Sequence, residues 1–214
     1  MSEAGQMAPL VPSSARAEAP AAVRPPLILA SGSPRRLELL RRIGVAPARV
    51  LPPEIDESPL RQELPRPLAG RLSQAKARAV MALEPHALVL AADTVVGVGR
   101  RILPKAETEA QARDCLALIS GRRHRVYTGV ALGLPDGRLL TRVVESIVTF
   151  QRLTPQQVEA YIASGEWRGK AGGYTIQESA EAFVRFLSGS HSNVVGLPLH
   201  ETAQLLRGVG WLRP

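Results

Sequence analysis

The chain has 214 residues, of which 45% are hydrophobic and 21% charged, a composition typical of a soluble globular protein with one large or two small domains. Its net charge of +8 favours an anionic partner, although charge alone does not separate a nucleotide enzyme from a nucleic-acid binder. An aromatic content of 4% disfavours a base-stacking platform for single strands, so we do not expect nucleic acid as the main partner.

Signals for disulfides, metal clusters and membranes are missing from the sequence. Cys115 is the only cysteine, and its apolar surroundings favour a buried structural role over a nucleophile. The four histidines are scattered without metal-ligand spacing, which favours structural or surface roles. No stretch approaches the ~18 apolar residues of a membrane span, and no signal-peptide pattern opens the chain. We therefore expect a cytoplasmic protein without a membrane partner.

Residues 1–24 are rich in alanine, proline and serine and show no hydrophobic periodicity. This composition predicts a disordered leader over 1–24, followed by one folded domain over 25–214.

The domain opens with an apolar strand at Leu27–Ala30, a small-residue turn at 31–33 and a helix that begins at Pro34. Ser33 suits the N-cap of that helix, and proline suits its first position. Arg35 and Arg36 lie in the first turn, where the helix dipole disfavours cations. Together with the N–H groups of the turn, they could form a phosphate cradle. The alternative is a surface helix whose arginines face water.

The remaining elements follow from apolar periodicity, capping residues and turn signals. A flexible, glycine-rich loop is expected over 170–174. The elements interleave without strict alternation, which predicts an α/β fold with a mixed sheet. The expected strands are 50–53, 87–92, 95–98, 102–103, 125–134, 138–151, 174–177 and 182–187, and the expected helices are 68–83, 107–119, 154–163 and 199–206.

Two acidic positions could serve catalysis. Asp93 directly follows an apolar strand, and a carboxylate at the end of a strand is a common catalytic placement in α/β folds, although an ordinary capping role is equally open. Glu57 lies in a cluster with Glu54 and Asp56, and clustered carboxylates suit a hard cation such as Mg²⁺. A solvated acidic loop is the alternative for this cluster. Lys76 and Lys105, taken alone, are expected to be surface lysines.

Three strings carry a family resemblance: SGSPRRLELL at 31–40, ADT at 92–94 and GYTIQ at 173–177. In this order they resemble the Maf-like nucleoside triphosphate pyrophosphatases, also called septum formation proteins. The resemblance runs from about residue 27 to residue 206. It implies an elongated mixed-sheet fold similar to that of inosine triphosphatases, with a cleft between two lobes and a homodimeric assembly.

The resemblance also implies a reaction and its residues. A nucleoside triphosphate would be cleaved at the α–β phosphoanhydride, giving a nucleoside monophosphate and pyrophosphate. Asp93 would accept the proton of water, and Glu57 and Asp93 would hold a divalent metal, Mg²⁺ first and Mn²⁺ as the alternative. The remaining implied roles are phosphate binding by Ser31, Ser33, Arg35 and Arg36, and charge neutralisation by Lys76 and Lys105.

Arg35, Thr94 and Gln177 match the trio of the branch that acts on dTTP, UTP and modified pyrimidine nucleotides. The family commonly continues this last motif with glycine, whereas this chain has Glu178. The departure removes backbone freedom and adds a carboxylate near the expected base site. A non-catalytic regulator of cell division that senses nucleotide or binds nucleic acid is the alternative function.

Overall fold

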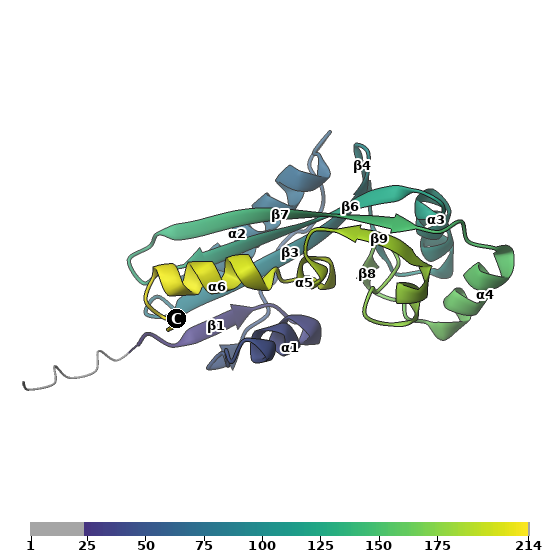
Figure 1. The fold of residues 1–214 in the computed structure, drawn as a ribbon. Helices are drawn as coiled ribbons and strands as arrows, with labels where there is room; N and C mark the ends of the chain where they lie inside the picture. The colour runs from purple at the N-terminus through teal and green to yellow at the C-terminus, as the bar shows by residue number, and fades with distance from the viewer. Residues whose placement is uncertain (1–23, 214) are drawn as a thin grey trace, which may run out of the picture.

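A seven-stranded mixed sheet runs along the molecule in the computed structural model, which describes residues 24–213 (Figure 1). The strand order is β2-β1-β3-β6-β7-β9, with β4 paired to β3. β1 pairs in parallel with β2 and β3, and all other pairs are antiparallel, which confirms the predicted mixed α/β sheet. The strands are β1 Leu27–Ala30, β2 Arg49–Val50, β3 Leu88–Val98, β4 Arg101–Leu103, β6 Arg123–Gly133, β7 Leu139–Phe150 and β9 Val184–Ser188.

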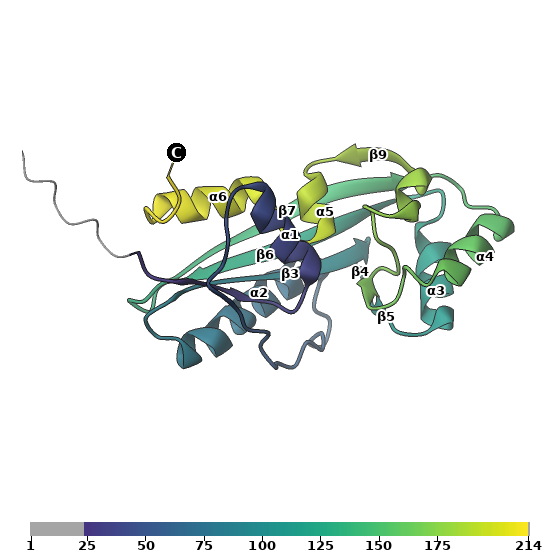
Figure 2. The same cartoon turned by 90° about the horizontal axis from the view of Figure 1, so that it is seen from below.

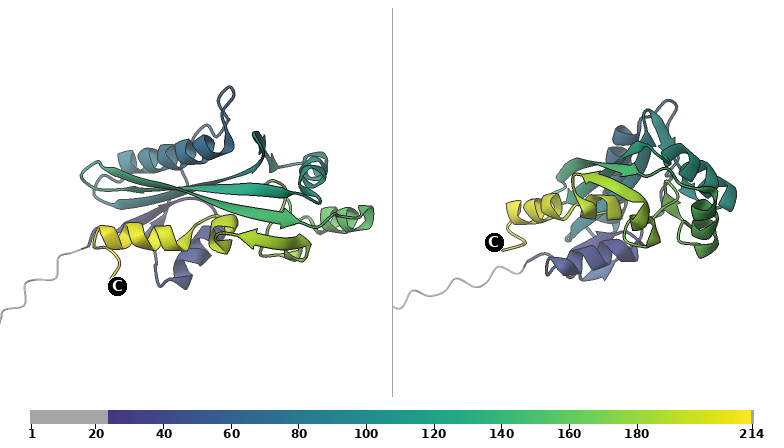
Figure 3. Two further views of the ribbon diagram at one scale, coloured as in Figure 1. Left: turned by 45° about the horizontal axis from the view of Figure 1, so that its top comes forward. Right: turned by 45° about the vertical axis from the view of Figure 1, so that its right-hand side comes forward.

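Helices cover both faces of one end of this sheet, and we call this end the first lobe. α2 (Pro65–Leu83) packs on one face, and α1 (Pro34–Arg42) and α6 (Leu199–Gly208) pack on the other (Figure 3). The alternation of β1 explains this arrangement, because Leu27 and Leu29 join the core beneath α1 and α6 while Ile28 joins the core beneath α2. No described helix is long and apolar enough to span a membrane.

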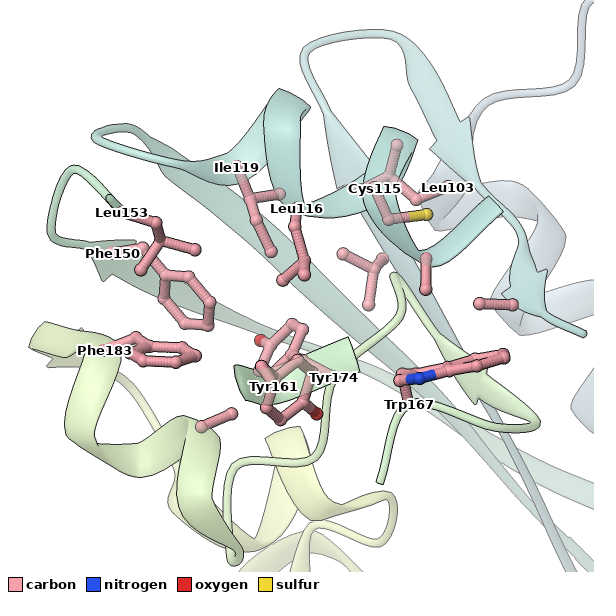
Figure 4. Close-up of a cluster of buried hydrophobic side chains, with 14 of the residues drawn as sticks. Leu103, Cys115, Leu116, Ile119, Phe150, Leu153, Tyr161, Trp167, Tyr174 and Phe183 are labelled. Atoms are coloured by element: carbon pink, nitrogen blue, oxygen red, sulfur yellow. The ribbon is translucent and has the colours of Figure 1, made fainter. Parts of the chain in front are cut away.

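The second lobe lies at the opposite end of the long strands (Figure 2). It contains α3 (Glu109–Ile119), α4 (Pro155–Ser164), the 3₁₀ helix η1 (Ser179–Phe183) and the two-stranded sheet of β5 (Lys105–Ala106) and β8 (Lys170–Ala171). Its core gathers most of the chain's aromatic side chains, with Phe150, Tyr174 and the fully buried Trp167 among them (Figure 4). α5 (His191–Val195) leads back toward the first lobe.

Gly129 brings α2 close to the sheet. It lies on β6 opposite Asp93 of β3, and a Cβ at this position would come within 2.1 Å of the carbonyl oxygen of Ala69 and 2.6 Å of Ser73 Oγ. Only a glycine leaves room for the helix at this distance. The close approach holds α2 directly over the middle of β3.

Replacing Gly129 by alanine should therefore destabilise the protein by about 1–3 kcal/mol, the usual cost of overpacking. The obstructing atom belongs to the helix backbone, so α2 as a whole has to move. Urea unfolding measures the free-energy change. Gly208→Ala is the control, because a Cβ there meets nothing within 4 Å. Equal midpoints for the Gly129→Ala variant and the wild type would contradict the prediction.

Four local predictions need correction, and one lies outside the described residues. Asp93 does not follow a strand but sits inside β3, because β6 pairs with β3 from Val89 through Gly97. Residues 174–177 form turns rather than a strand, and the expected strand 182–187 begins at Val184 after η1. The loop at 170–174 contains β8 and a close-packed turn. Apart from Arg24, the predicted leader lies outside the described residues.

Candidate active site

A cavity of about 480 Å³ lies between the two lobes. Its walls come from the β1–α1 turn and the middle of β3 in the first lobe, and from residues 168–177 in the second lobe. The cavity gathers all ten of the site residues expected from the sequence, which are Ser31, Ser33, Arg35, Arg36, Glu57, Lys76, Asp93, Thr94, Lys105 and Gln177.

Arg36 stabilises the turn between β1 and α1. Its guanidinium donates to Ser31 Oγ at 2.9 Å, to the Gly196 carbonyl at 2.8 Å and to Thr94 Oγ1 at 3.3 Å. These bonds connect α1 with β3 and with the segment after α5. Arg36 therefore positions the wall of the cavity, and only its remaining N–H groups are left for an anion.

Ser33 occupies the N-cap position of α1, as predicted, but its side chain makes no capping bond. Its backbone N–H donates instead to Ser31 Oγ at 3.2 Å. Arg35, in the first turn, forms no ion pair with any residue of 24–213. Burial lowers the pKa of Arg35, an effect that the charge of Glu178 opposes. Arg35 is thus a cation held in the cavity wall without a bonded counterion.

Lys76 bridges the two carboxylates of the cavity. Its Nζ lies 2.5 Å from Asp93 Oδ1 and 2.6 Å from Glu57 Oε1. Lys76 is 6% exposed and Asp93 is 3% exposed, so the default expectation of a surface lysine is wrong for Lys76. The other oxygen of Glu57 pairs with Lys105, whose side chain is about half exposed. The charged groups therefore follow one another in the order Asp93, Lys76, Glu57 and Lys105, from the buried end to the exposed end of the network.

The two lysines control the ionisation of Glu57. Partial burial alone would raise the pKa of this carboxyl, but hydrogen bonds and charge from Lys105 and Lys76 outweigh burial and hold the pKa at about 2. Glu57 is therefore a carboxylate at all physiological pH values, rather than a group that exchanges protons during a reaction.

The two carboxylates can also be tested as metal ligands. Within residues 24–213, no three His, Cys, Asp or Glu side chains cluster closely enough to hold a metal ion by themselves. Mg²⁺ usually binds through one or two carboxylates, with substrate phosphates and water as its other ligands. Glu57 and Asp93 fit a cation that binds together with a phosphate chain, and they do not form a protein-only metal cage.

Thr94 and Gln177 approach the cavity from opposite lobes. Thr94 Oγ1 lies 2.9 Å from Thr128 Oγ1, which donates in turn to the carbonyl of Asn193 at 3.0 Å. These bonds attach α5 to the sheet. Gln177 lies in the turn of the second lobe that faces β3 across the cavity.

Cys115 and His124 have the structural roles expected for them. Cys115 is buried, and burial raises the pKa of its thiol to about 11, so it is not a thiolate nucleophile. His124 is buried, and its Nε2 hydrogen-bonds Tyr174 Oη at 2.8 Å. Burial lowers the pKa of His124 to about 4, so its ring is neutral at physiological pH.

Sequence reasoning missed several residues that line the second-lobe wall, five of which have charged or bulkier side chains. Two are cations, Arg168 and Lys170, and the others belong to the turn beside Gln177: Tyr174, Thr175 and Ile176. No local spacing separates Arg168 from the chain's many other arginines. The composition could have indicated Lys170, because the chain has only three lysines and all three line this cavity.

The model of the family described as "Maf-like protein" matches residues 26–209. The chain belongs to the Maf-like family. Among its Maf-like relatives, a dTTP/UTP pyrophosphatase from Novosphingobium aromaticivorans is 64% identical over 191 residues, which cover 89% of this chain and 95% of that protein. A dTTP/UTP pyrophosphatase from Caulobacter vibrioides is 60% identical over 190 residues, covering 89% and 98%.

This Maf-like chain also resembles solved structures at low sequence identity. A HAM1 protein from Coxiella burnetii aligns over 85% of this chain and 98% of its own, with a TM-score of 0.47 and 15% identity.

Proposed function

We propose that this Maf-like protein hydrolyses dTTP and UTP at the α–β phosphoanhydride and releases a nucleoside monophosphate and pyrophosphate. Membership of the family and 60–64% identity to dTTP/UTP pyrophosphatases place the chain among the nucleotide pyrophosphatases, which are hydrolases acting on acid anhydrides. The observation that carries the proposal in the structure is the buried Asp93 in a cavity whose other charged lining residues, apart from Glu57, are all cations.

The arrangement suits hydrolysis of a phosphoanhydride. Asp93 is held by Lys76 at one oxygen, and its other oxygen forms no bond with a described residue, so it can orient water and accept its proton. The charge that develops on the leaving pyrophosphate would be stabilised by the cations of the walls, which are fixed before substrate arrives. Apart from the Ser33 N–H, which donates to Ser31 Oγ, the N–H groups of the turn at 31–33 would be directed to phosphate oxygens.

We propose that the reaction depends on a divalent cation, Mg²⁺ or Mn²⁺. Glu57 and Asp93 would hold the cation together with phosphate oxygens of the substrate. The cation would supply neutralisation of phosphate charge and would orient the phosphate chain. Lys76 lies between the same two carboxylates, so its ammonium would keep their charges balanced when no substrate is present.

The proposed pyrimidine preference, including modified pyrimidine nucleotides, depends on Arg35, Thr94 and Gln177. All three line the cavity, and a glutamine amide can both donate to and accept from the edge of a uracil or thymine ring. Homodimer formation, a cytoplasmic location and a link to cell division stay predictions from the resemblance.

A panel of nucleoside triphosphates tests the proposed function. With Mg²⁺ present, we expect pyrophosphate release from dTTP and UTP to exceed release from canonical purine nucleotides. Release should stop in EDTA and return with Mg²⁺ or Mn²⁺. Faster hydrolysis of nucleotides with another base would agree with the proposed reaction but contradict the proposed pyrimidine specificity. Glu178, which replaces the glycine of the family motif, would then be the first residue to test. No turnover of any nucleotide by folded protein would contradict the proposed function.

A further inference from the structure

Lysine is rare in this chain and confined to one place. The chain has 27 basic residues, and only Lys76, Lys105 and Lys170 are lysines, all of which line the cavity. Everywhere else the chain uses arginine. A lysine ammonium is a compact point charge, whereas the arginine guanidinium is a broad planar fork. Three arginines also line the cavity, but it is the only place where the chain uses lysine. Among the three lysines, the mechanism described above assigns a role only to Lys76 and Lys105.

The backbone of Lys170 is firmly held. Its N–H donates to the Trp167 carbonyl at 3.0 Å, and its own carbonyl accepts from Gly173 N at 3.0 Å. Trp167 is fully buried in the second-lobe core (Figure 4). Gly172, with φ +70°, packs so tightly on Val96 of β3 that a Cβ would come within 2.9 Å of it. This packing replaces the flexible loop expected from the sequence and fixes where the lysine side chain starts.

The cations of the cavity fall into two groups. Lys76 and Lys105 are ion-paired with the two carboxylates, and Arg36 is hydrogen-bonded to neutral oxygens. Arg35, Arg168 and Lys170 form no ion pair with any residue between 24 and 213, and of these Arg168 lies over the Trp167 ring. The other two, Arg35 and Lys170, come from α1 in the first lobe and β8 in the second, and they line the same cavity.

These two cations also oppose one another. Burial lowers the pKa of Lys170, the charge of Arg35 lowers it further, and Glu178 partly compensates. Burial likewise lowers the pKa of Arg35, and Glu178 again opposes the effect. Two cations that repel each other across a cavity are stabilised when an anion binds between them. Glu178, which is exposed, lies near enough to act on both charges without forming an ion pair with either.

We propose that Lys170 and Arg35 form an anion subsite that holds the pyrophosphate part of the nucleotide from both lobes at once. The proposal rests on the proposed function, because that function supplies the anion. A pyrimidine ring is uncharged, so it would leave the repulsion between the two cations unrelieved, whereas a pyrophosphate group carries enough charge for both. Arg168, which is stacked 4.7 Å from the Trp167 ring centre, lines the same wall beside Lys170.

Calorimetric titration with inorganic pyrophosphate tests the subsite without any base or turnover. Lys170→Gln should weaken pyrophosphate binding about 10- to 100-fold, the usual effect of losing one charge-assisted hydrogen bond. Arg100→Gln removes the same charge from an exposed turn outside the cavity and should change the affinity less than about twofold. Equal affinities of the Lys170→Gln and Arg100→Gln variants for pyrophosphate would overturn the proposal. It would also be overturned if Lys170→Gln weakened the binding of nucleotide but not the binding of pyrophosphate.

A second measurement uses wild-type protein and does not depend on how the variant folds. Because the chain has only three lysines, acylation of each amine can be followed separately by mass spectrometry. Saturating pyrophosphate should slow acylation of Lys170 at least fivefold. An unchanged rate at Lys170 would overturn the subsite.

The proposed function and the subsite fail in different ways. If the wild type hydrolyses neither dTTP nor UTP but still binds pyrophosphate in a way that depends on Lys170, the proposed function is contradicted and the subsite is retained. Normal hydrolysis with pyrophosphate binding that is indifferent to Lys170 would contradict the subsite alone.

Discussion

Asp93→Asn should reduce kcat for dTTP and UTP by about 10²–10⁴, the usual contribution of a general base. The substitution removes the proton acceptor but keeps the size of the side chain and an oxygen that can accept from Lys76 Nζ. Folding and substrate binding should therefore change much less than turnover. Initial rates of pyrophosphate release at saturating nucleotide measure the effect.

Asp136→Asn is the matched control for this substitution. Asp136 lies in the exposed turn between β6 and β7, where it accepts from the Arg138 backbone through an oxygen that asparagine retains. Its kcat should stay within about twofold of wild type. A folded Asp93→Asn protein with full turnover would exclude Asp93 as the base. If neither the wild type nor the variant hydrolyses nucleotides and Asp93→Asn strengthens anion binding, the sensing or nucleic-acid-binding regulator becomes the better description.

Lys76→Met should destabilise the protein by about 3–5 kcal/mol, which is the effect of removing one partner from a buried ion pair. Methionine fills the space of the aliphatic stem but leaves the buried carboxylate of Asp93 without its counter-charge. Urea unfolding measures the loss, and EDTA in the buffer prevents a divalent cation from replacing the ammonium.

Lys105→Met provides the comparison, because Lys105 pairs with the same Glu57 but is about half exposed. An exposed pair contributes about 0–1 kcal/mol, so this variant should unfold close to wild type. Adding Asp93→Asn to Lys76→Met should recover part of the lost stability, since the uncompensated charge is then removed. Equal stabilities for Lys76→Met and Lys105→Met would show that burial of Lys76 contributes little.

Local sequence carried much of the information on the elements and on the candidate site. The apolar string at Leu27–Ala30, the proline at position 34 and the capping pair Thr154 and Gln157 each correspond to an element or cap in the structure. These signals are local because strand alternation and helix capping depend on a few neighbouring residues. Seven of the ten expected site residues lie in the three motif strings, whereas Glu57, Lys76 and Lys105 owe their expected roles to the family resemblance. The structure brings all ten to one cavity.

Some local expectations failed because a distant segment decides the conformation. The apolar run before Asp93 predicts that the strand ends there, because a charged residue interrupts the run. The strand continues instead, because β6 pairs with β3 through Gly97 and β4 pairs with it through Val98. The turn after Gly173 has the β-branched composition of a strand, yet no described strand pairs with residues 174–177. Strand formation requires a partner, and single-chain propensity does not provide one.

Sequence alone predicts the mixed α/β class, most elements of the first lobe and ten of the residues that line the cavity. Tertiary packing, by contrast, buries Lys76 between two carboxylates, bonds Arg36 to the turn before α1, and brings Lys170 of the second lobe to the same cavity as Arg35. The physical reason is the same in all three cases. Burial, ion pairing and repulsion depend on distances between segments that lie far apart in the chain, and no local pattern encodes them.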